Sequence, residues 1–251
     1  MKIDHLVVNV DASVQEDKQV IRQIEAMGLP YKPKWGKGTR GFKVSNLWIG
    51  REYFELVRIK TRDGGGWISE WTTRYLKGHR GLVGFALEVD DIDATYQRLK
   101  ALNIEITAPE PLRFRWFFNL LTRTMPWRNS YLPAFKGVPF QFFLQQMNDE
   151  KSRHFMEQYM VPNSRENDIV GIAEVTVEGT LTLEDLEIIH ALFPDCEQQG
   201  DTLNIHLGSQ VIRFRESGTS TYGVEVLMDC NRAEHAGKTM RVGDLQIRNS
   251  E

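Results

Sequence analysis

GLVGFALEVDDIDATYQRLKALNIEI, at residues 81–106, is the stretch that decides the fold. It reads as an apolar strand, an aspartate-rich helix cap, an amphipathic helix with Ile92 and Leu99 on one side, and a strand at 104–107. A version of it opens the chain at residues 3–11, IDHLVVNVD, and a weaker one recurs at 170–178, VGIAEVTVE. The repetition predicts three copies of one structural unit.

The first copy continues into several short strands. Its helix begins with a capping-box pattern at Ser13 and ends near residue 27. Strands are predicted at 39–44, 47–49 and 52–59, with a turn at 45–46. The unit is therefore βαβββ.

The other copies repeat this plan with changes. The second copy has predicted strands at 112–118 and 138–145, separated by a long loop at 119–137. The third copy has a helix capped by Thr182 with Asp185. Its strands are predicted at 202–207, 211–215 and 222–228, with one edge strand within 240–248.

These patterns predict an α+β fold made of repeated βαβββ modules. Two modules, over residues 1–147, pair into a cupped mixed sheet with helices outside and a cavity inside. Residues 148–167 are polar and mixed, and we expect a linker with a little helix there. Residues 168–251 form an appended third βαβββ-like module.

The composition limits the classes of function. The 251 residues are 41% hydrophobic and 26% charged, which is typical of a globular protein with a core. A formal charge of −3 gives no basic footprint for nucleic acid or an anionic membrane. No signal peptide or apolar run of ~18–20 residues occurs, and the two cysteines have no CxxC spacing, so we expect a cytoplasmic protein with reduced thiols.

Strand alternation predicts which side chains face the cavity of the cup. Each strand has one wholly apolar face, and these faces hold Leu6, Val8, Val10, Phe54, Leu56, Val83, Phe85, Leu87, Phe140, Phe142 and Leu144. The opposite faces, which we expect to line the cup, hold Ile3, His5, Val7, Asn9, Tyr53, Glu55, Leu82, Gly84, Glu88, Gln141 and Gln145.

Glu55 is the strongest single signal on the cup face. A carboxylate between two apolar residues in the middle of a strand is costly to bury without a partner. It therefore indicates a metal cation, a proton, or an ion pair with Arg40 or Arg115. Those two arginines are also candidates to bind an anionic substrate, and Trp116 and Phe140 are candidates to line its pocket.

Together these stretches resemble a known superfamily. The strand starts IDHLVVNVD and GLVGFALEVDDIDATYQRL and the strand end YFELV are similar to the vicinal-oxygen-chelate superfamily, which has the glyoxalase and bleomycin-resistance fold. The long glyoxalase-like bacterial members of this superfamily carry stretches that look like GTRGFKVSNLWIGREYFELV, FRWFF and VPFQFFLQ. The resemblance covers residues 2–147 well and the third module loosely.

The resemblance also implies where a metal would bind. Metal-dependent members take four ligands from the first and last strands of two paired modules, which match His5, Glu55, Gly84 and Gln141 here. Glycine has no side chain to offer, so the set is reduced to His5, Glu55 and Gln141. A mixed nitrogen and oxygen set suits Zn, Ni, Mn, Fe or Mg.

The functional hypotheses follow from the same cup. The first is a glyoxalase-like small-molecule enzyme of isomerase or lyase type, assisted by a divalent metal, with His5 and Glu55 as catalytic residues. The second is a non-catalytic protein that binds or sequesters a small molecule, and a third is assembly, with a homodimer formed through the third module. No nucleotide cofactor is expected, since the glycines at 64–66 lack the context of a phosphate loop.

Overall fold

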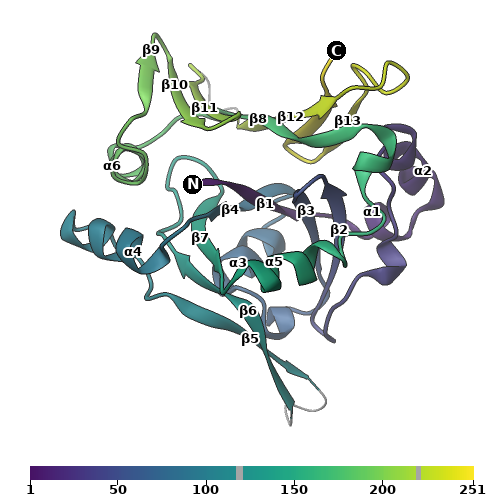
Figure 1. The fold of residues 1–251 in the computed structure, drawn as a ribbon, viewed down its shortest axis with the longest axis horizontal. Coiled ribbons are helices and arrows are strands. Elements are labelled where there is room, and N and C mark those ends of the chain that lie inside the picture. The colour runs from purple at the N-terminus through teal and green to yellow at the C-terminus, as the bar shows by residue number, and fades with distance from the viewer. Residues whose placement is uncertain (117–120, 219–221) are drawn as a thin grey trace.

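The computed structural model describes residues 1–116, 121–218 and 222–251, without the side chains of 114–123. Its strands form two seven-stranded mixed sheets that lie one above the other (Figure 1). In spatial order, the first sheet contains β2 (Phe42–Ile49), β3 (Glu52–Ile59), β1 (Lys2–Asn9), β4 (Gly81–Glu88), β7 (Gln141–Met147), β6 (Leu121–Tyr131) and β5 (Glu110–Trp116).

The second sheet is built on the same plan as the first. In spatial order it contains β13 (Thr239–Val242), β14 (Leu245–Asn249), β12 (Gly223–Cys230), β8 (Ile169–Gly179), β11 (Gln210–Glu216), β10 (Thr202–Leu207) and β9 (Glu197–Gln199). Each sheet has an antiparallel central pair, β1–β4 or β8–β12, and each central strand has a parallel neighbour outside it. This repetition confirms an α+β fold of repeated modules, with residues beyond 168 forming a sheet of their own.

The helices are short and lie at the edges of the sheets and on the far face of the first one (Figure 1). They are α1 (Ala12–Glu16), α2 (Lys18–Ala26), α3 (Ser69–Leu76), α4 (Ile92–Ala101), α5 (Glu150–Glu157) and α6 (Leu183–Leu192), with 3₁₀ turns at Pro33–Trp35, Gly64–Gly66 and Ser164–Asn167. No helix among the described residues is long and apolar enough to cross a membrane.

The predicted helix caps were partly right. Thr182 and Asp185 form the capping box of α6, with Thr182 accepting from the Asp185 amide and Asp185 accepting from the Thr182 amide. The first helix is instead broken into α1 and α2, and Asp17, whose carboxylate accepts from the Gln19 amide at 2.7 Å, caps the second piece. The cap pattern at Ser13 was a misreading, because Ser13 lies inside α1.

Four local predictions of strands, turns and loops were wrong. The turn expected at 45–46 lies inside β2, because the buried Ser45 hydroxyl is hydrogen-bonded to Gln15 and Tyr31 and needs no turn or solvent. The loop expected at 119–137 contains the long strand β6, and residues 104–107 have no strand. The single edge strand expected within 240–248 is a hairpin of β13 and β14.

The main core lies between the two sheets. The apolar face of the first sheet packs against the second sheet as well as against the helices, and this core includes Leu6, Val8, Phe54, Phe85, Phe142, Val175, Val226, Ile247, Ile24, Leu99 and Ile189. Ring contacts join the sheets directly, since Phe140 and Phe214 stack with centroids 6.2 Å apart.

A second, smaller apolar cluster fills the opposite face of the first sheet. It consists of Val7, Phe42, Val57, Ile59, Trp71, Val83, Ala86 and Phe143. Trp71 comes from α3, so the connector between the first two modules covers part of the cup. The concave face is therefore half closed by this chain's own residues.

Candidate functional site

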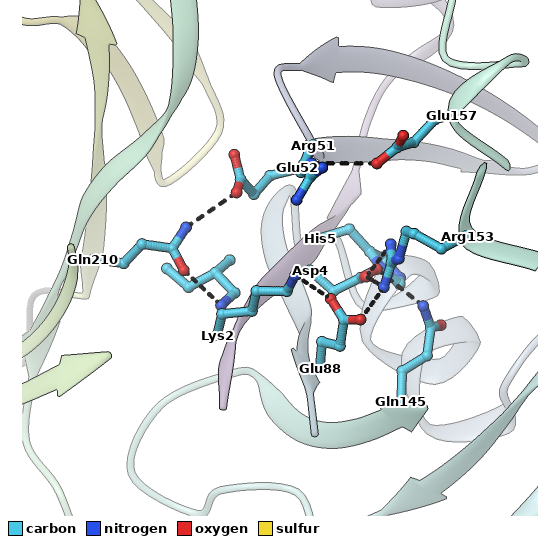
Figure 2. Close-up of polar contacts among 11 residues, drawn as sticks. Lys2, Asp4, His5, Arg51, Glu52, Glu88, Gln145, Arg153, Glu157 and Gln210 are labelled. Atoms are coloured by element: carbon cyan, nitrogen blue, oxygen red, sulfur yellow. Dashed lines mark hydrogen bonds and ion pairs between the residues drawn. The ribbon is translucent and has the colours of Figure 1, made fainter. Parts of the chain in front are cut away.

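The polar residues of the concave face gather at one end of β1 (Figure 2). β1 supplies Asp4 and His5, β3 supplies Glu55, β4 supplies Glu88, and β7 supplies Gln145. Asp4 and His5 are neighbours in a strand, yet His5 Nδ1 lies 2.6 Å from Asp4 Oδ1. A break in the β1–β4 register between Ile3 and His5 marks a bulge that accommodates this contact.

Asp4 is the buried centre of the network. Its side chain is only 2% exposed. Oδ1 is bound by His5 Nδ1 and by Gln145 Nε2 at 3.0 Å, and Oδ2 accepts from both terminal nitrogens of Arg153 at 3.3 Å. Burial alone would raise the pKa of Asp4, but the hydrogen bond from His5 and the charges of His5 and Arg153 lower it below its usual range. Asp4 is therefore a fixed negative charge.

His5 is held in one orientation by its neighbours. It is 4% exposed, its ring stacks on Tyr53 with centroids 4.4 Å apart, and it meets the edge of Phe143 at 5.4 Å. Because Nδ1 donates to the Asp4 carboxylate, Nε2 is left free to accept or exchange a proton. An aspartate that orients a histidine in this way is typical of acid–base sites.

Glu55 lies beside His5 on the same face. In the parallel β1–β3 register His5 is opposite Tyr53, and Val7 is opposite Glu55. Burial raises the pKa of Glu55, the positive charge of His5 opposes this, and the Asp4 carboxylate adds to it. The described part of the chain gives Glu55 no hydrogen bond or ion pair, so its carboxyl group is free to bind or transfer a proton.

Two phenols and a hollow complete this region. Burial raises the pKa of Tyr53 and of Tyr131, so both hydroxyl groups stay protonated near neutral pH. The Glu55 charge contributes to both shifts, which indicates that it lies near both rings. Tyr131 also lines a hollow of about 690 Å³ with Asn129, Arg113 and Thr107. This hollow lies beside β5 and β6, and Tyr131 is the residue that it shares with the surroundings of Glu55.

The four positions that the resemblance assigns to metal ligands do not fit a metal here. Trp71 Nε1 donates to Gln141 Oε1 at 2.9 Å, and Gln141 Nε2 donates to the Leu132 carbonyl, so the amide is occupied. A Cβ added at Gly84 would lie 2.6 Å from the Trp71 ring. Within the described residues no three His, Cys, Asp or Glu side chains are arranged to hold a metal ion.

The structure separates the predicted substrate-binding residues. Arg40 is exposed in the segment before β2. The pKa of Asp63 is lowered mainly by the hydrogen bond from Thr61, and the charge of Arg40 adds to that lowering, whereas Arg40 has no part in the pKa shift of Glu55. Phe140 is fully buried between the two sheets, on the face away from the cup, because alternation along the strand places it with Phe142. Arg115 and Trp116 end β5, and their side chains lie outside the described residues.

Three residues of the site were missed from the sequence. Asp4 was assigned no role, although an aspartate between Ile3 and His5 on a buried strand is itself unusual. Arg153 was placed in a polar linker, and Trp71 in a connector. Neither Arg153 nor Trp71 has a sequence signal that points to the cup, because their positions depend on how distant segments pack.

Comparisons with known proteins agree with this architecture. A crystal structure of a hypothetical protein from Staphylococcus aureus is 16% identical, covers 99% of this chain and 98% of its own, and has a TM-score of 0.70. A triple mutant of 4-hydroxymandelate synthase from Streptomyces coelicolor is 13% identical, covers 91% and 70%, and has a TM-score of 0.54. A methylmalonyl-CoA epimerase variant from Streptomyces coelicolor, in complex with 2-nitronate-propionyl-CoA, is 16% identical, covers 59% and 99%, and has a TM-score of 0.41. No curated protein matches the chain.

The Staphylococcus aureus protein and the 4-hydroxymandelate synthase variant share the fold of this chain. The family model described as "Glyoxalase-like domain" matches residues 3–190. The chain belongs to this glyoxalase-like family. The match extends past the first sheet into β8 and α6, so the second sheet is partly within the family's domain.

Proposed function

We propose that this protein is a small-molecule enzyme of isomerase or lyase type that moves a proton at a carbon next to a carbonyl group. Glu55 is the group that takes or returns the proton, and His5 Nε2 is the second acid–base group. One observation carries the proposal: a free carboxyl group with a raised pKa lies beside a histidine that a buried aspartate orients.

Each neighbour has a part in this chemistry. Proton transfer is efficient when the pKa of the catalytic group approaches the working pH, and burial moves Glu55 in that direction. The protonated Tyr53 and Tyr131 hydroxyls can donate hydrogen bonds to an oxygen that becomes negative as the proton leaves. The hollow that Tyr131 lines offers the substrate a place beside one of these two phenols.

The second candidate is a protein that binds a small molecule without converting it. The aromatic side of the concave face favours it, since Tyr131 stacks on Phe143 with centroids 5.2 Å apart and Trp71 meets both rings. Such surfaces bind flat or apolar ligands without acid–base groups. A protein that only binds its ligand does not require a carboxyl group with a raised pKa, so this candidate does not account for Glu55.

Proton exchange with deuterated water tests the two candidates against each other. Wild-type protein, Glu55→Gln and Glu225→Gln are incubated in D2O with small 2-oxo acids, hydroxyketones and acyl thioesters, and loss of the C–H signal is followed by proton NMR. We expect wild type to exchange at least one compound, and Glu55→Gln to be slower by about 10²–10⁴-fold. Glu225→Gln, on the outer face of the second sheet, is the matched control and should exchange as wild type does.

The outcomes separate the hypotheses. Equal exchange in wild type and Glu55→Gln would remove Glu55 from the chemistry. Saturable binding of a compound, seen as line broadening with no exchange in any variant, would favour the sequestering protein.

Divalent metal assistance is not part of the proposed mechanism, because Trp71 covers Gly84 and occupies Gln141. Elemental analysis of purified wild type and Glu55→Gln, after incubation with Zn, Ni and Mn, tests this choice. A stoichiometric ion that is bound by wild type and lost in Glu55→Gln would return His5 and Glu55 to the role of metal ligands.

A further inference from the structure

Helix α5, in the segment between the two sheets, reaches into the site through one side chain. Arg153 extends from α5 to the rim of the concave face, where Figure 2 shows it between Asp4 and Glu88. Its side chain is only 15% exposed. An arginine buried to this degree needs anionic partners, and both of its partners lie on the central strands of the first sheet.

The contacts of Arg153 are shared between two carboxylates. Both terminal nitrogens lie 3.3 Å from Asp4 Oδ2, and one of them also pairs with Glu88 Oε1. Lys2 Nζ binds the other oxygen of Glu88 at 2.9 Å. The planar guanidinium group is suited to bridging two carboxylates in this way, whereas an ammonium group is not.

Arg153 also offsets a concentration of negative charge. Asp4, Glu88, Glu55 and Glu52 lie on three adjacent strands, and the Asp4 charge contributes to raising the pKa of both Glu52 and Glu55. Tyr53 on β3 is a further titratable group that contacts His5, and Lys2 on β1 pairs with Glu88. Without Arg153 a buried Asp4 would have only His5 and Gln145 to satisfy it.

The helix that carries Arg153 is itself fixed at both ends. Asp149 caps it by accepting from the Ser152 amide at 2.7 Å, and Glu157 near its end pairs with Arg51 at 3.2 Å. Arg51 follows β2 in the turn before β3, so α5 is tied to the same strands that supply the site.

From this geometry we propose that Arg153 is a positioning residue, which holds the Asp4 carboxylate against His5 Nδ1 and thereby fixes the orientation of His5. The inference rests on the proposed function for its catalytic meaning, since Arg153 acts through Asp4 on His5. It assigns to α5 a part in the site that a linker would not have.

The test follows the hydrogen bond between His5 and Asp4 directly. Protein labelled with ¹⁵N in histidine is prepared as wild type, Arg153→Met, Arg153→Lys and Lys151→Met. The downfield proton signal of His5 Nδ1–H is recorded by NMR as the pH is lowered, and thermal unfolding is recorded for each variant. Lys151→Met removes a positive charge from an exposed position of the same helix and is the matched control.

We expect the wild-type signal to persist furthest as the pH falls, because Asp4 stays ionised. In Arg153→Met it should disappear at a pH higher by about one unit, since the carboxylate has lost its cation. Arg153→Lys keeps the charge but not the bridging geometry and should fall between these two, while Lys151→Met should match wild type.

A signal with the same pH range in Arg153→Met as in wild type would overturn the proposal. So would equal losses of thermal stability in Arg153→Met and Arg153→Lys with an unchanged His5 signal, because this would show a packing role alone. If Arg153→Met does not fold, a His5 signal in Arg153→Lys that persists over the same pH range as in wild type would likewise overturn the proposal. The NMR signal needs no turnover, so a protein that fails the deuterium-exchange assay still gives a separate answer about Arg153.

Discussion

The concave face of the first sheet and the outer face of the second sheet are built from the same strand arrangement but hold their charges differently. On the first sheet, Asp4 and His5 are buried and Glu55 is half-buried. α5 reaches Asp4 through Arg153, and Trp71 of α3 packs on the same face of the sheet. On the second sheet, the equivalent face is open. It holds a hollow of about 300 Å³ lined by Glu174, Thr176, Glu178, Glu225, Arg215 and Arg248.

The charges of the open face are paired side by side. Arg215 binds Glu178 at 2.9 Å, and about half of each of these side chains is exposed. Arg248 binds Glu225 at 3.0 Å, and more than a third of each of these side chains is exposed. Water screens such pairs, so each contributes little to stability. Because the two sheets share one strand arrangement and differ in the exposure of their charges, the strand arrangement alone does not produce a site of buried acid–base groups. The helices α3 and α5 cover the first sheet, and the burial that results shifts the pKa values of its carboxyl groups.

The largest effect is expected when the buried charge of the first sheet, on Asp4, is removed. We expect Asp4→Asn to lower the free energy of unfolding by about 3–5 kcal/mol, because Arg153 and His5 both lose the buried carboxylate that they share. Urea denaturation at pH 7, followed by tryptophan fluorescence, measures the change. A loss below about 1 kcal/mol would mean that Asp4 behaves like an exposed surface charge.

A second, smaller effect is expected where the two sheets meet. Glu52 accepts from Gln210 Nε2 at 3.3 Å (Figure 2). It also accepts from the Ile172 amide at 3.3 Å, and Gln210 Oε1 accepts from the Ile3 amide at 2.8 Å. Burial, the largest cause, raises the pKa of Glu52 from 4.5 to about 7. The folded state therefore binds a proton that the unfolded state has released.

The sign of the pH dependence follows from that difference. The contribution of Glu52 to stability is fully present below about pH 4.5 and is lost as the pH rises to about 7, by about 3 kcal/mol in total. Glu52→Gln should remove this slope. Urea denaturation of both proteins at several values between pH 5 and pH 8 measures it, and parallel curves would contradict the predicted shift.

The smallest effect is expected on the open face. Glu225→Gln removes one partner of the exposed Arg248 pair and should change the free energy of unfolding by less than about 1 kcal/mol. The same urea experiment at low and high salt measures it. A loss as large as that of Asp4→Asn would show that the second sheet also depends on its charges.

The faces of most strands could be predicted from the sequence because alternation along an unbroken strand is strict. Phe54 and Leu56 lie in the main core, and Val7 lies on the cup side, as predicted. Ile3, Leu82 and Val83 lie on the faces opposite to those predicted. The β1–β4 register shifts at both ends of the pairing, and a bulge reverses the alternation beyond it.

The site could be predicted only in part for a related reason. His5 and Glu55 follow from alternation within β1 and β3, so their placement on one face was accessible. Asp4 turns to that face only through the bulge. Trp71 and Arg153 arrive from segments about 70 and 150 residues along the chain from β1, and no local pattern encodes such contacts.

The close approach of Trp71 to Gly84 limits the order in which this chain can acquire substitutions. Any side chain at position 84 would collide with the indole ring, whose nearest atoms lie 2.6 Å from an added Cβ. A histidine or glutamate there is therefore accessible only after position 71 has become smaller. Because losing a buried tryptophan typically costs about 3–5 kcal/mol, that first step leads through a less stable intermediate. A four-ligand site at these strands would therefore require changes at both positions 71 and 84.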